Sequence, residues 1–118
     1  MEIWKDIEGF EGRYQISSWG RVRNKDGMIL KPYMNNKGYF KISLQEGRKA
    51  IKKRIHRLVA IAFVPNPKNL PQVNHMDGNK QNNSYTNLEW VTNKENLIHA
   101  RRMRALANET DNSHRRDG

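Results

Sequence analysis

Four polar residues in the second half of the chain could act together chemically: Asn74, His75, Asn87 and Asn96. A free imidazole titrates near about pH 6.5, so His75 can take a proton from water at neutral pH. The side-chain carbonyls of asparagine suit Mg²⁺, which keeps several waters and needs few protein ligands. The chain has no cysteine, so any metal must bind oxygen or imidazole nitrogen. These residue types fit proton transfer assisted by a divalent cation.

Each of these residues also has an ordinary structural explanation. His75 precedes an Asp-Gly turn, Asn87 is a common turn residue, and Asn96 would face solvent on a helix. Asp77 is a weaker candidate for a metal ligand, because an aspartate there more often holds its own turn through backbone N–H groups. His99 lies three residues after Asn96 on the same helical face and is a less favoured ligand. The joint spacing, rather than any one residue, supports a site.

The elements expected around these residues are a strand, a long polar loop, a second strand and a helix. Residues 73–75 form a short strand, and residues 88–91 alternate as a second one. The loop between them, 76–83, is polar and rich in turn residues. The sequence Thr-Asn-Lys-Glu at 92–95 is a capping box, which starts a helix expected to end near Asn108. The polar residues therefore lie at strand ends and in the first helical turn.

The front of the chain predicts short antiparallel strands separated by glycine turns. An Asp-Gly pair at 26–27 is a hairpin signal. Residues 39–45 alternate between apolar and polar positions, and residues 49–55 return as a less regular strand after a Glu-Gly turn. The large apolar side chains of the first twenty residues are expected mainly in the core: Trp4, Ile7, Phe10, Tyr14, Ile16 and Trp19.

The hairpin over 39–55 is expected to carry Lys41, Lys52 and Arg54 on one outward face. A two-stranded ribbon is narrow enough to enter the major groove of DNA. Residues 56–64 are apolar enough for a buried helix, ended by the prolines that follow, and His56 is expected to be structural. Residues 109–118 lack apolar side chains and are expected to be a flexible tail.

The composition favours a small protein that binds a polyanion. The chain has 118 residues and 13.9 kDa, with 22 Lys and Arg against 12 Asp and Glu. Most of the charge of +10 lies in residues 1–70, which hold 15 basic and 6 acidic residues. An excess of that size attracts nucleic acid or an anionic membrane surface. The longest apolar run, 58–64, is too short to span a bilayer, and no signal-peptide pattern precedes it. We therefore expect a cytoplasmic protein with no membrane partner.

Residues 73–96 resemble the ββα-metal motif of the HNH nuclease family, in the sequence VNHMDGNKQNNSYTNLEWVTNKEN. Asn74 and His75 match the first paired position of that motif, Asn87 its middle asparagine, and Asn96 its last position. The front also looks like the DNA-binding motif fused to phage and intron-encoded homing endonucleases. The segments that carry this second resemblance are 4–7, 9–12, 14–17 and 20–23.

The resemblance implies an α+β fold with antiparallel β hairpins and a short helix, followed by a ββα-metal motif. The expected divisions are a β-rich basic DNA-binding region at 1–55, a helix with the nuclease core at 56–108, and the tail. The implied function is a metal-dependent DNA endonuclease of homing or nicking type, located in the host cytoplasm if a phage encodes it. Its partner is double-stranded DNA, with no small-molecule cofactor.

The resemblance also assigns roles at the site. His75 is the general base for phosphodiester hydrolysis, and Asn87 braces the loop that orients it. One Mg²⁺ or Mn²⁺ ion would be held by Asn74 and Asn96. The DNA contacts are expected from Lys41, Lys52 and Arg54 on the ribbon and from Arg101 and Arg102 on the helix after the site.

Two departures from the family pattern leave alternatives open. Many members have a carboxylate or imidazole where Asn74 and Asn96 stand, so the cation should be held weakly. Many also carry a four-cysteine zinc site; here no structural zinc is expected, and the helix cap and Trp90 should replace it. The alternative function is a catalytically inactive DNA-binding module of the same fold. A basic RNA-binding protein would explain the charge but not the asparagine and histidine positions.

Overall fold

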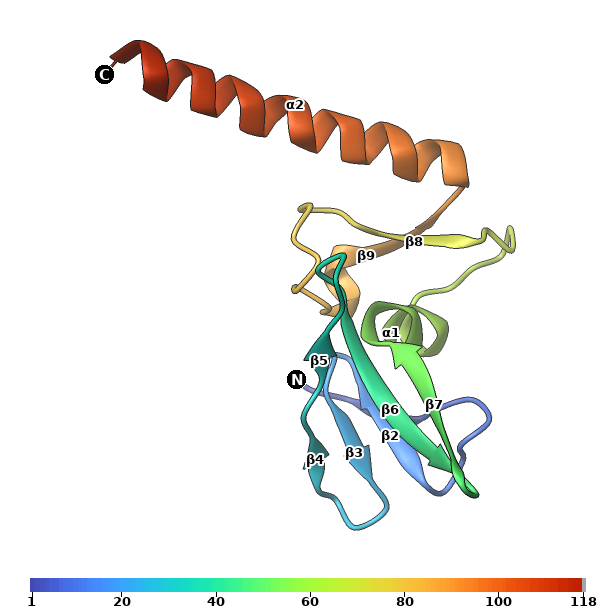
Figure 1. Ribbon diagram of the computed structural model, residues 1–118. Coiled ribbons are helices and arrows are strands. Elements are labelled where there is room, and N and C mark those ends of the chain that lie inside the picture. Colours follow the sequence, from blue (N-terminus) through green and yellow to red (C-terminus); the bar gives the residue numbers. More distant parts are fainter. Residues whose placement is uncertain (118) are drawn as a thin grey trace.

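The computed structural model describes residues 1–117, and the side chains of residues 1–107. Its described part contains three small antiparallel sheets, a short buried helix and a long helix at the end (Figure 1). The elements, in chain order, are β1 (Trp4–Asp6), β2 (Tyr14–Ser17), β3 (Val22–Asn24), β4 (Ile29–Leu30), β5 (Tyr33–Met34), β6 (Phe40–Glu46), β7 (Lys49–Arg54), α1 (Ile55–Phe63), β8 (Gln72–His75), a 3-10 turn (Tyr85–Asn87), β9 (Leu88–Val91) and α2 (Asn93–Asp117).

The front of the protein consists of a four-stranded sheet, β1-β2-β3-β4, and a three-stranded sheet, β5-β6-β7. The alternation predicted in β6 is confirmed, because Ile42 and Leu44 are buried. Strand pairing aligns Lys41 with Arg54 and Ser43 with Lys52. Side chains of one strand alternate between faces, so Lys41, Lys52 and Arg54 share one face, as expected. We call this face the basic ribbon.

The back of the protein is the expected strand–strand–helix unit. Strands β8 and β9 pair antiparallel, and α2 crosses β8 (Figure 1). The capping box is confirmed: the Glu95 backbone N–H donates to Thr92 Oγ1 at 3.1 Å, and the Thr92 N–H donates to Glu95 Oε1 at 3.1 Å. These two bonds satisfy donors that a helix start leaves unpaired. Together with the antiparallel front, this unit confirms the predicted α+β fold class.

One core joins front and back. Helix α1 contributes Ile55, Leu58 and Val59, which cluster with Ile16 of β2 and Val73 of β8. Burying each such side chain contributes about 1.5–3 kcal/mol relative to leaving it in water. Because this single cluster includes both halves, the site at the back is positioned by the sheets at the front. The expected division of the chain into a DNA-binding region at 1–55 and a nuclease core from residue 56 stays a prediction.

The expectation that Trp19 belongs to the core is wrong for this side chain, which is 53% exposed. The positions before it, Ser17 and Ser18, are fully buried instead. Their hydroxyls accept backbone N–H groups: Ser17 Oγ from Arg21 at 2.9 Å and Ser18 Oγ from Ile3 at 3.0 Å. The hydroxyls of the two buried serines are thus hydrogen-bonded. These small side chains occupy the interior of the tight turn, and the large indole of Trp19 lies outside it.

The ends of both helices differ from the expected ones. Helix α1 begins at Ile55 rather than at residue 56, and α2 continues to Asp117 rather than ending near Asn108. The side chains of the tail at 109–118 lie outside the described residues, and its flexibility stays a prediction. Among the described residues, no helix combines the length and apolar character needed to span a membrane.

Candidate nuclease site

Three of the predicted site residues line one cleft of about 440 Å³ between β8 and α2: Asn74, His75 and Asn96. His99, the less favoured ligand, lines the same cleft from the next turn of α2. The cleft forms because β8 ends at His75 while α2 starts directly after β9, the partner strand of β8. Residues far apart in the sequence therefore face each other, as the joint spacing predicted.

His75 is buried, and its ring is held by a single hydrogen bond. Its Nε2 lies 2.8 Å from Oδ1 of Asn83, and only 4% of the residue is exposed. A carbonyl oxygen can only accept, so Nε2 carries the proton and the neutral ring keeps its lone pair on Nδ1. Burial is the largest effect on the pKa of His75 and lowers it, although the bond to Asn83 acts in the opposite direction. At neutral pH the ring is therefore a free base.

Two further rings fix the position of His75. The ring centroids of His56 and His75 are 5.0 Å apart, and the ring of Tyr39 stacks on His56 at 4.9 Å. Burial, together with the charges of His75, Arg54 and Arg57, lowers the pKa of His56 to about 3. His56 is thus a neutral, buried ring, as expected for a structural residue.

The side chain of Asn74 is oriented by a residue that the sequence did not indicate. Its Nδ2 donates to Oε1 of Glu89 at 2.8 Å, across the pairing of β8 with β9. A carboxylate only accepts hydrogen bonds, so the NH₂ end of the amide faces Glu89 and the Oδ1 end is left for another partner. The pairing of Asn74 with Glu89 depends on the register of β8 against β9. That register could not be predicted from the sequence, because a long loop separates the two strands.

Asn87 braces the loop between β8 and β9. Its Nδ2 donates to Asp77 Oδ1 and to the Asn82 carbonyl, both at 2.9 Å, while its Oδ1 accepts the Asp77 N–H at 3.1 Å. These bonds fit the implied bracing role. The role of Asn87 in catalysis stays a prediction.

Asp77 is occupied by the same loop. Its carboxylate also accepts the Asn79 N–H at 2.8 Å and the Asn82 side-chain amide at 3.0 Å. The bond from Asn82 is the largest of the effects that lower the pKa of Asp77. This geometry favours turn formation over metal binding.

The residues of the cleft fit one weakly held divalent cation. Asn74 and Asn96 offer carboxamide oxygens, and His99 offers imidazole nitrogen, a donor set compatible with Mg²⁺ or Mn²⁺. The Nε2 of His99 lies 3.2 Å from the Met76 carbonyl oxygen, which can only accept a hydrogen bond from it. Within the part that the structure describes, no group of three or more His, Cys, Asp and Glu could hold a metal. Water and phosphate oxygens would have to complete the coordination shell.

Two cationic side chains lie at this cleft. Arg104 and Lys80 line it, whereas Arg101 and Arg102 are exposed and lie outside its lining. Arg104 is, with Arg101 and Arg102, one of the three arginines expected to follow the site on its helix, and it lies two turns after Asn96 on one face. Lys80 lies in the polar loop, where periodicity gives no signal. Contact of Arg101 and Arg102 with DNA stays a prediction.

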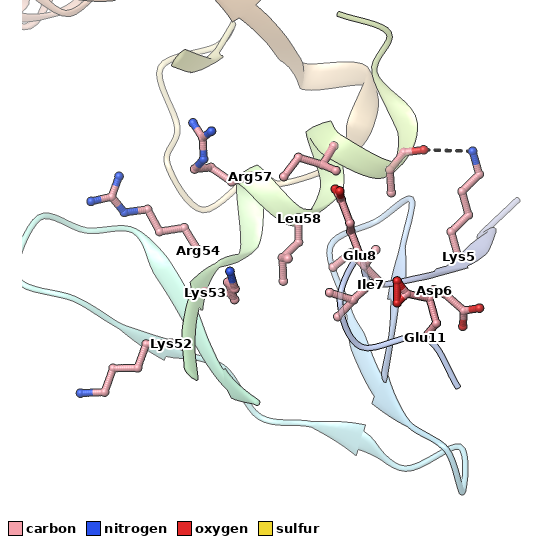
Figure 2. A pocket seen from close by; sticks show the side chains of 13 residues that line it. Lys5, Asp6, Ile7, Glu8, Glu11, Lys52, Lys53, Arg54, Arg57 and Leu58 are labelled. Carbon is pink, nitrogen blue, oxygen red and sulfur yellow. Dashed lines mark hydrogen bonds between the residues drawn. The ribbon is translucent and has the colours of Figure 1, made fainter. Parts of the chain in front are cut away.

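A second cleft, of about 660 Å³, lies beside the basic ribbon (Figure 2). In the figure, the side chains of Lys52, Arg54 and Arg57 extend on one side and carboxylates of the β1 region lie on the other. Those carboxylates belong to Asp6, Glu8 and Glu11. The ribbon is therefore strongly basic on the side that faces away from the β1 region.

The fold and the cleft form a strand–strand–helix unit of the ββα type, and two sequence families match the chain. Residues 53–98 match the HNH endonuclease family, and residues 2–45 match the NUMOD4 motif. The chain thus contains a segment of the HNH endonuclease family at 53–98, with a NUMOD4 motif in front of it. This confirms the resemblance noted from the residues.

Individual relatives agree with this assignment. The DNA endonuclease I-HmuI of Bacillus phage SP01 is 47% identical over 95 residues, which cover 80% of this chain and 55% of that protein. An uncharacterized HNH endonuclease of Acanthamoeba polyphaga mimivirus is 46% identical over 104 residues, covering 84% of this chain and 26% of that protein. This chain therefore spans about half, or less, of the length of these relatives.

A solved structure also matches, described as DNA binding and cleavage by the HNH homing endonuclease I-HmuI. Its TM-score is 0.74 and its identity 47%, over 81% of this chain and 56% of that one. The similarity supports the same architecture for the front sheets and the strand–strand–helix unit.

Proposed function

We propose that the protein is a DNA endonuclease that hydrolyses a phosphodiester bond with His75 as general base and one divalent ion. The observation that carries this proposal is the single cleft that holds His75 together with Asn74 and Asn96. The relationship to proteins named as HNH endonucleases supports it.

His75 would accept the proton of the attacking water at Nδ1. The bond from Nε2 to Asn83 holds the ring in the tautomer that this step needs, and burial keeps it neutral. A positioned general base typically contributes about 10²–10⁴-fold to the rate.

The divalent ion would be held by Oδ1 of Asn74 and by the side chain of Asn96, with His99 as the less favoured ligand. When bound, such an ion supplies charge neutralisation at the phosphate and stabilises the departing oxygen. Lys80 and Arg104 line the cleft and can attract the phosphate, since lysine and arginine side chains form charge-assisted hydrogen bonds to phosphate oxygens. Asn74 is held by Glu89 with its oxygen end free for this role.

Double-stranded DNA is the proposed substrate. The basic ribbon presents Lys41, Lys52 and Arg54 on one face, and the chain carries a net charge of +10. Phosphate contacts of this kind hold DNA without reading its sequence. Arg101 and Arg102, exposed on α2, are further candidates for backbone contacts.

One observation favours a second candidate function. The two amide ligands are neutral, and neutral oxygens hold a cation more weakly than carboxylates do. A protein with this fold that binds DNA without cutting it would have the same ribbon and the same loop.

Plasmid nicking distinguishes the two functions. With Mg²⁺ or Mn²⁺ we expect supercoiled plasmid to become nicked, and EDTA should stop the reaction. A binding module would shift the plasmid in a gel and leave it supercoiled at every metal concentration. His114→Ala, a histidine substitution near the end of the chain, serves as the matched control for His75→Ala.

A further inference from the structure

We propose that Asn83 is a positioning residue for His75, and that a turn of the front motif holds Asn83 in place. The turn in question, residues 17–20, lies between β2 and β3. This inference rests on the proposed role of His75 as the general base. It assigns a task to two residues, Asn83 and Gly20, that the motif spacing did not indicate.

The first step is the hydrogen bond between the two side chains. Asn83 Oδ1 lies 2.8 Å from His75 Nε2, and the two residues are 7% and 4% exposed. A neutral imidazole has a single N–H, so a fixed acceptor at Nε2 leaves Nδ1 as the basic nitrogen. If Asn83 moved away, both tautomers would be accessible, and part of the population would have its proton on the wrong nitrogen.

The second step is the contact between Gly20 and Asn83. A Cβ at Gly20 would lie 2.9 Å from the Cβ of Asn83 and 3.3 Å from its backbone oxygen. The turn backbone therefore lies directly against Asn83, and only glycine leaves enough room. Gly20 also has φ of +93°, a conformation that side chains disfavour.

The third step is a main-chain bond on the other side of Asn83. The Tyr85 N–H donates to the Ser18 carbonyl at 2.9 Å. Ser18 is itself fully buried and bonded to Ile3 through both its hydroxyl and its backbone N–H. The loop segment from Asn83 to Tyr85 is thus attached to the turn by a bond and by close packing.

The two sides of this contact belong to different matched segments. Gly20 and Ser18 lie in the NUMOD4 motif at 2–45, and Asn83 and Tyr85 lie in the HNH segment at 53–98. The front motif is therefore built into the support of the general base. Two apolar side chains of the same shape could often replace a buried polar pair at little cost to stability. Packing alone therefore does not require the His75–Asn83 hydrogen bond, whereas orienting the His75 ring does.

The test is ¹⁵N NMR of the full chain with labelled histidines, at about pH 8, where a neutral imidazole dominates. In the wild type we expect the His75 proton on Nε2. Asn83→Leu should lose this preference and reduce the nicking rate by about tenfold or more, because a misplaced group can cost up to about 10²-fold. Asn83→Asp keeps an oxygen acceptor and should retain the proton on Nε2.

The contact with the turn is tested by two glycine variants that are matched in backbone conformation. Gly20 and Gly9 have φ of +93° and +86°, but a Cβ at Gly9 meets nothing within 4 Å. Gly20→Ala should change the His75 tautomer and the nicking rate, whereas Gly9→Ala should match the wild type in both. Equal behaviour of the two variants would overturn the role of the turn, even if Asn83→Leu does not fold.

The outcomes separate this inference from the proposed function. If the wild type fails to nick while Asn83→Leu still moves the His75 proton, the endonuclease proposal is contradicted and the positioning role is supported. If Asn83→Leu folds, keeps the proton on Nε2 and nicks at the wild-type rate, the positioning role is overturned and the endonuclease proposal stands.

Discussion

In the proposed site, two asparagine side chains, Asn74 and Asn96, would determine how tightly a cation is held beside His75. Both are neutral, so affinity depends on the orientation of their oxygens more than on charge. Asn74 is oriented by its bond to Glu89, whereas the Asn96 side chain, in the first turn of α2, has no hydrogen bond to a residue of the described part. The weaker support of Asn96 makes it the more informative residue to change.

Asn96→Ala should raise the Mg²⁺ or Mn²⁺ concentration needed for half-maximal nicking, because water replaces a fixed oxygen only at an entropic cost. Asn96→Asp should retain nicking, since a carboxylate can fill the same position. The measurement is the nicking rate across a metal titration. Normal nicking by Asn96→Ala at low metal, with loss in His99→Ala, would assign the ligand to His99 instead.

The bond between Asn74 and Glu89 gives a second prediction. Glu89→Ala should weaken metal binding, because the amide of Asn74 is then free to rotate its oxygen away from the cleft. Glu89→Gln keeps an acceptor for Nδ2 and should stay closer to the wild type. Binding of Mn²⁺ in the presence of uncleaved duplex, followed by electron paramagnetic resonance, measures this directly. Identical affinity in Glu89→Ala and the wild type would show that Glu89 does not orient Asn74.

His56 predicts a pH dependence of stability. Burial of the ring disfavours its charged form and lowers the pKa of His56 from the ordinary 6.5 to about 3 in the folded protein. Between these values the unfolded chain binds the proton and the folded chain does not, so stability falls as pH falls below about 6.5. The contribution is about 1.4 kcal/mol per pH unit, or about 2 kcal/mol between pH 7 and pH 5.

Urea unfolding at the two pH values measures this loss. His56→Phe, which keeps a ring beside Tyr39 but cannot titrate, should lose about 2 kcal/mol less than the wild type between pH 7 and pH 5. An equal pH dependence in both proteins would mean that His56 is not the group responsible.

At the level of single residues, spacing could predict which side chains meet but not what holds them. Asn74, His75 and Asn96 were predicted from their positions relative to two strands and a helix start. Asn83 and Glu89 were not, because their partners depend on the path of the loop and on strand register. A turn-rich loop has many conformations of similar local energy, and only the complete set of contacts selects one.

Among the elements, the basic ribbon is the proposed DNA-binding surface. Its strand alternation was readable because one face is buried: Ile42 and Leu44 point to the core and fix the opposite face outward. The exposure of Trp19 could not be predicted in this way, because the alternation of β2 ends at Ser17. In the turn that follows, the buried side chains are serines rather than apolar residues.

The ribbon should account for a large part of the salt dependence of DNA binding. Each phosphate contact changes the log–log slope of affinity against salt by about −0.9, so a triple change of Lys41, Lys52 and Arg54 to Ala should flatten it by roughly three. A matched triple change to Ala at exposed lysines outside the ribbon, Lys25, Lys31 and Lys68, should alter the slope less. Equal slopes for wild type and ribbon variant would place the DNA on another surface.

At the scale of the whole molecule, front and back share one core and meet again at the loop between β8 and β9. Helix α1 packs against β2 on one side and against β8 and β9 on the other. The ribbon leads directly into this helix, since β7 ends at Arg54 and α1 begins at Ile55. The ribbon is thus connected to the cleft through helix α1 rather than through a linker, which suits the proposed placement of DNA on the ribbon.

The central claim is that His75 removes a proton in DNA hydrolysis and is not a main contact to DNA. The most direct test measures the nicking rate and the dissociation constant of His75→Ala on the same duplex. We predict a loss in rate of about 10²–10⁴-fold with an affinity within a few-fold of wild type. Nicking by His75→Ala at the wild-type rate would contradict the claim.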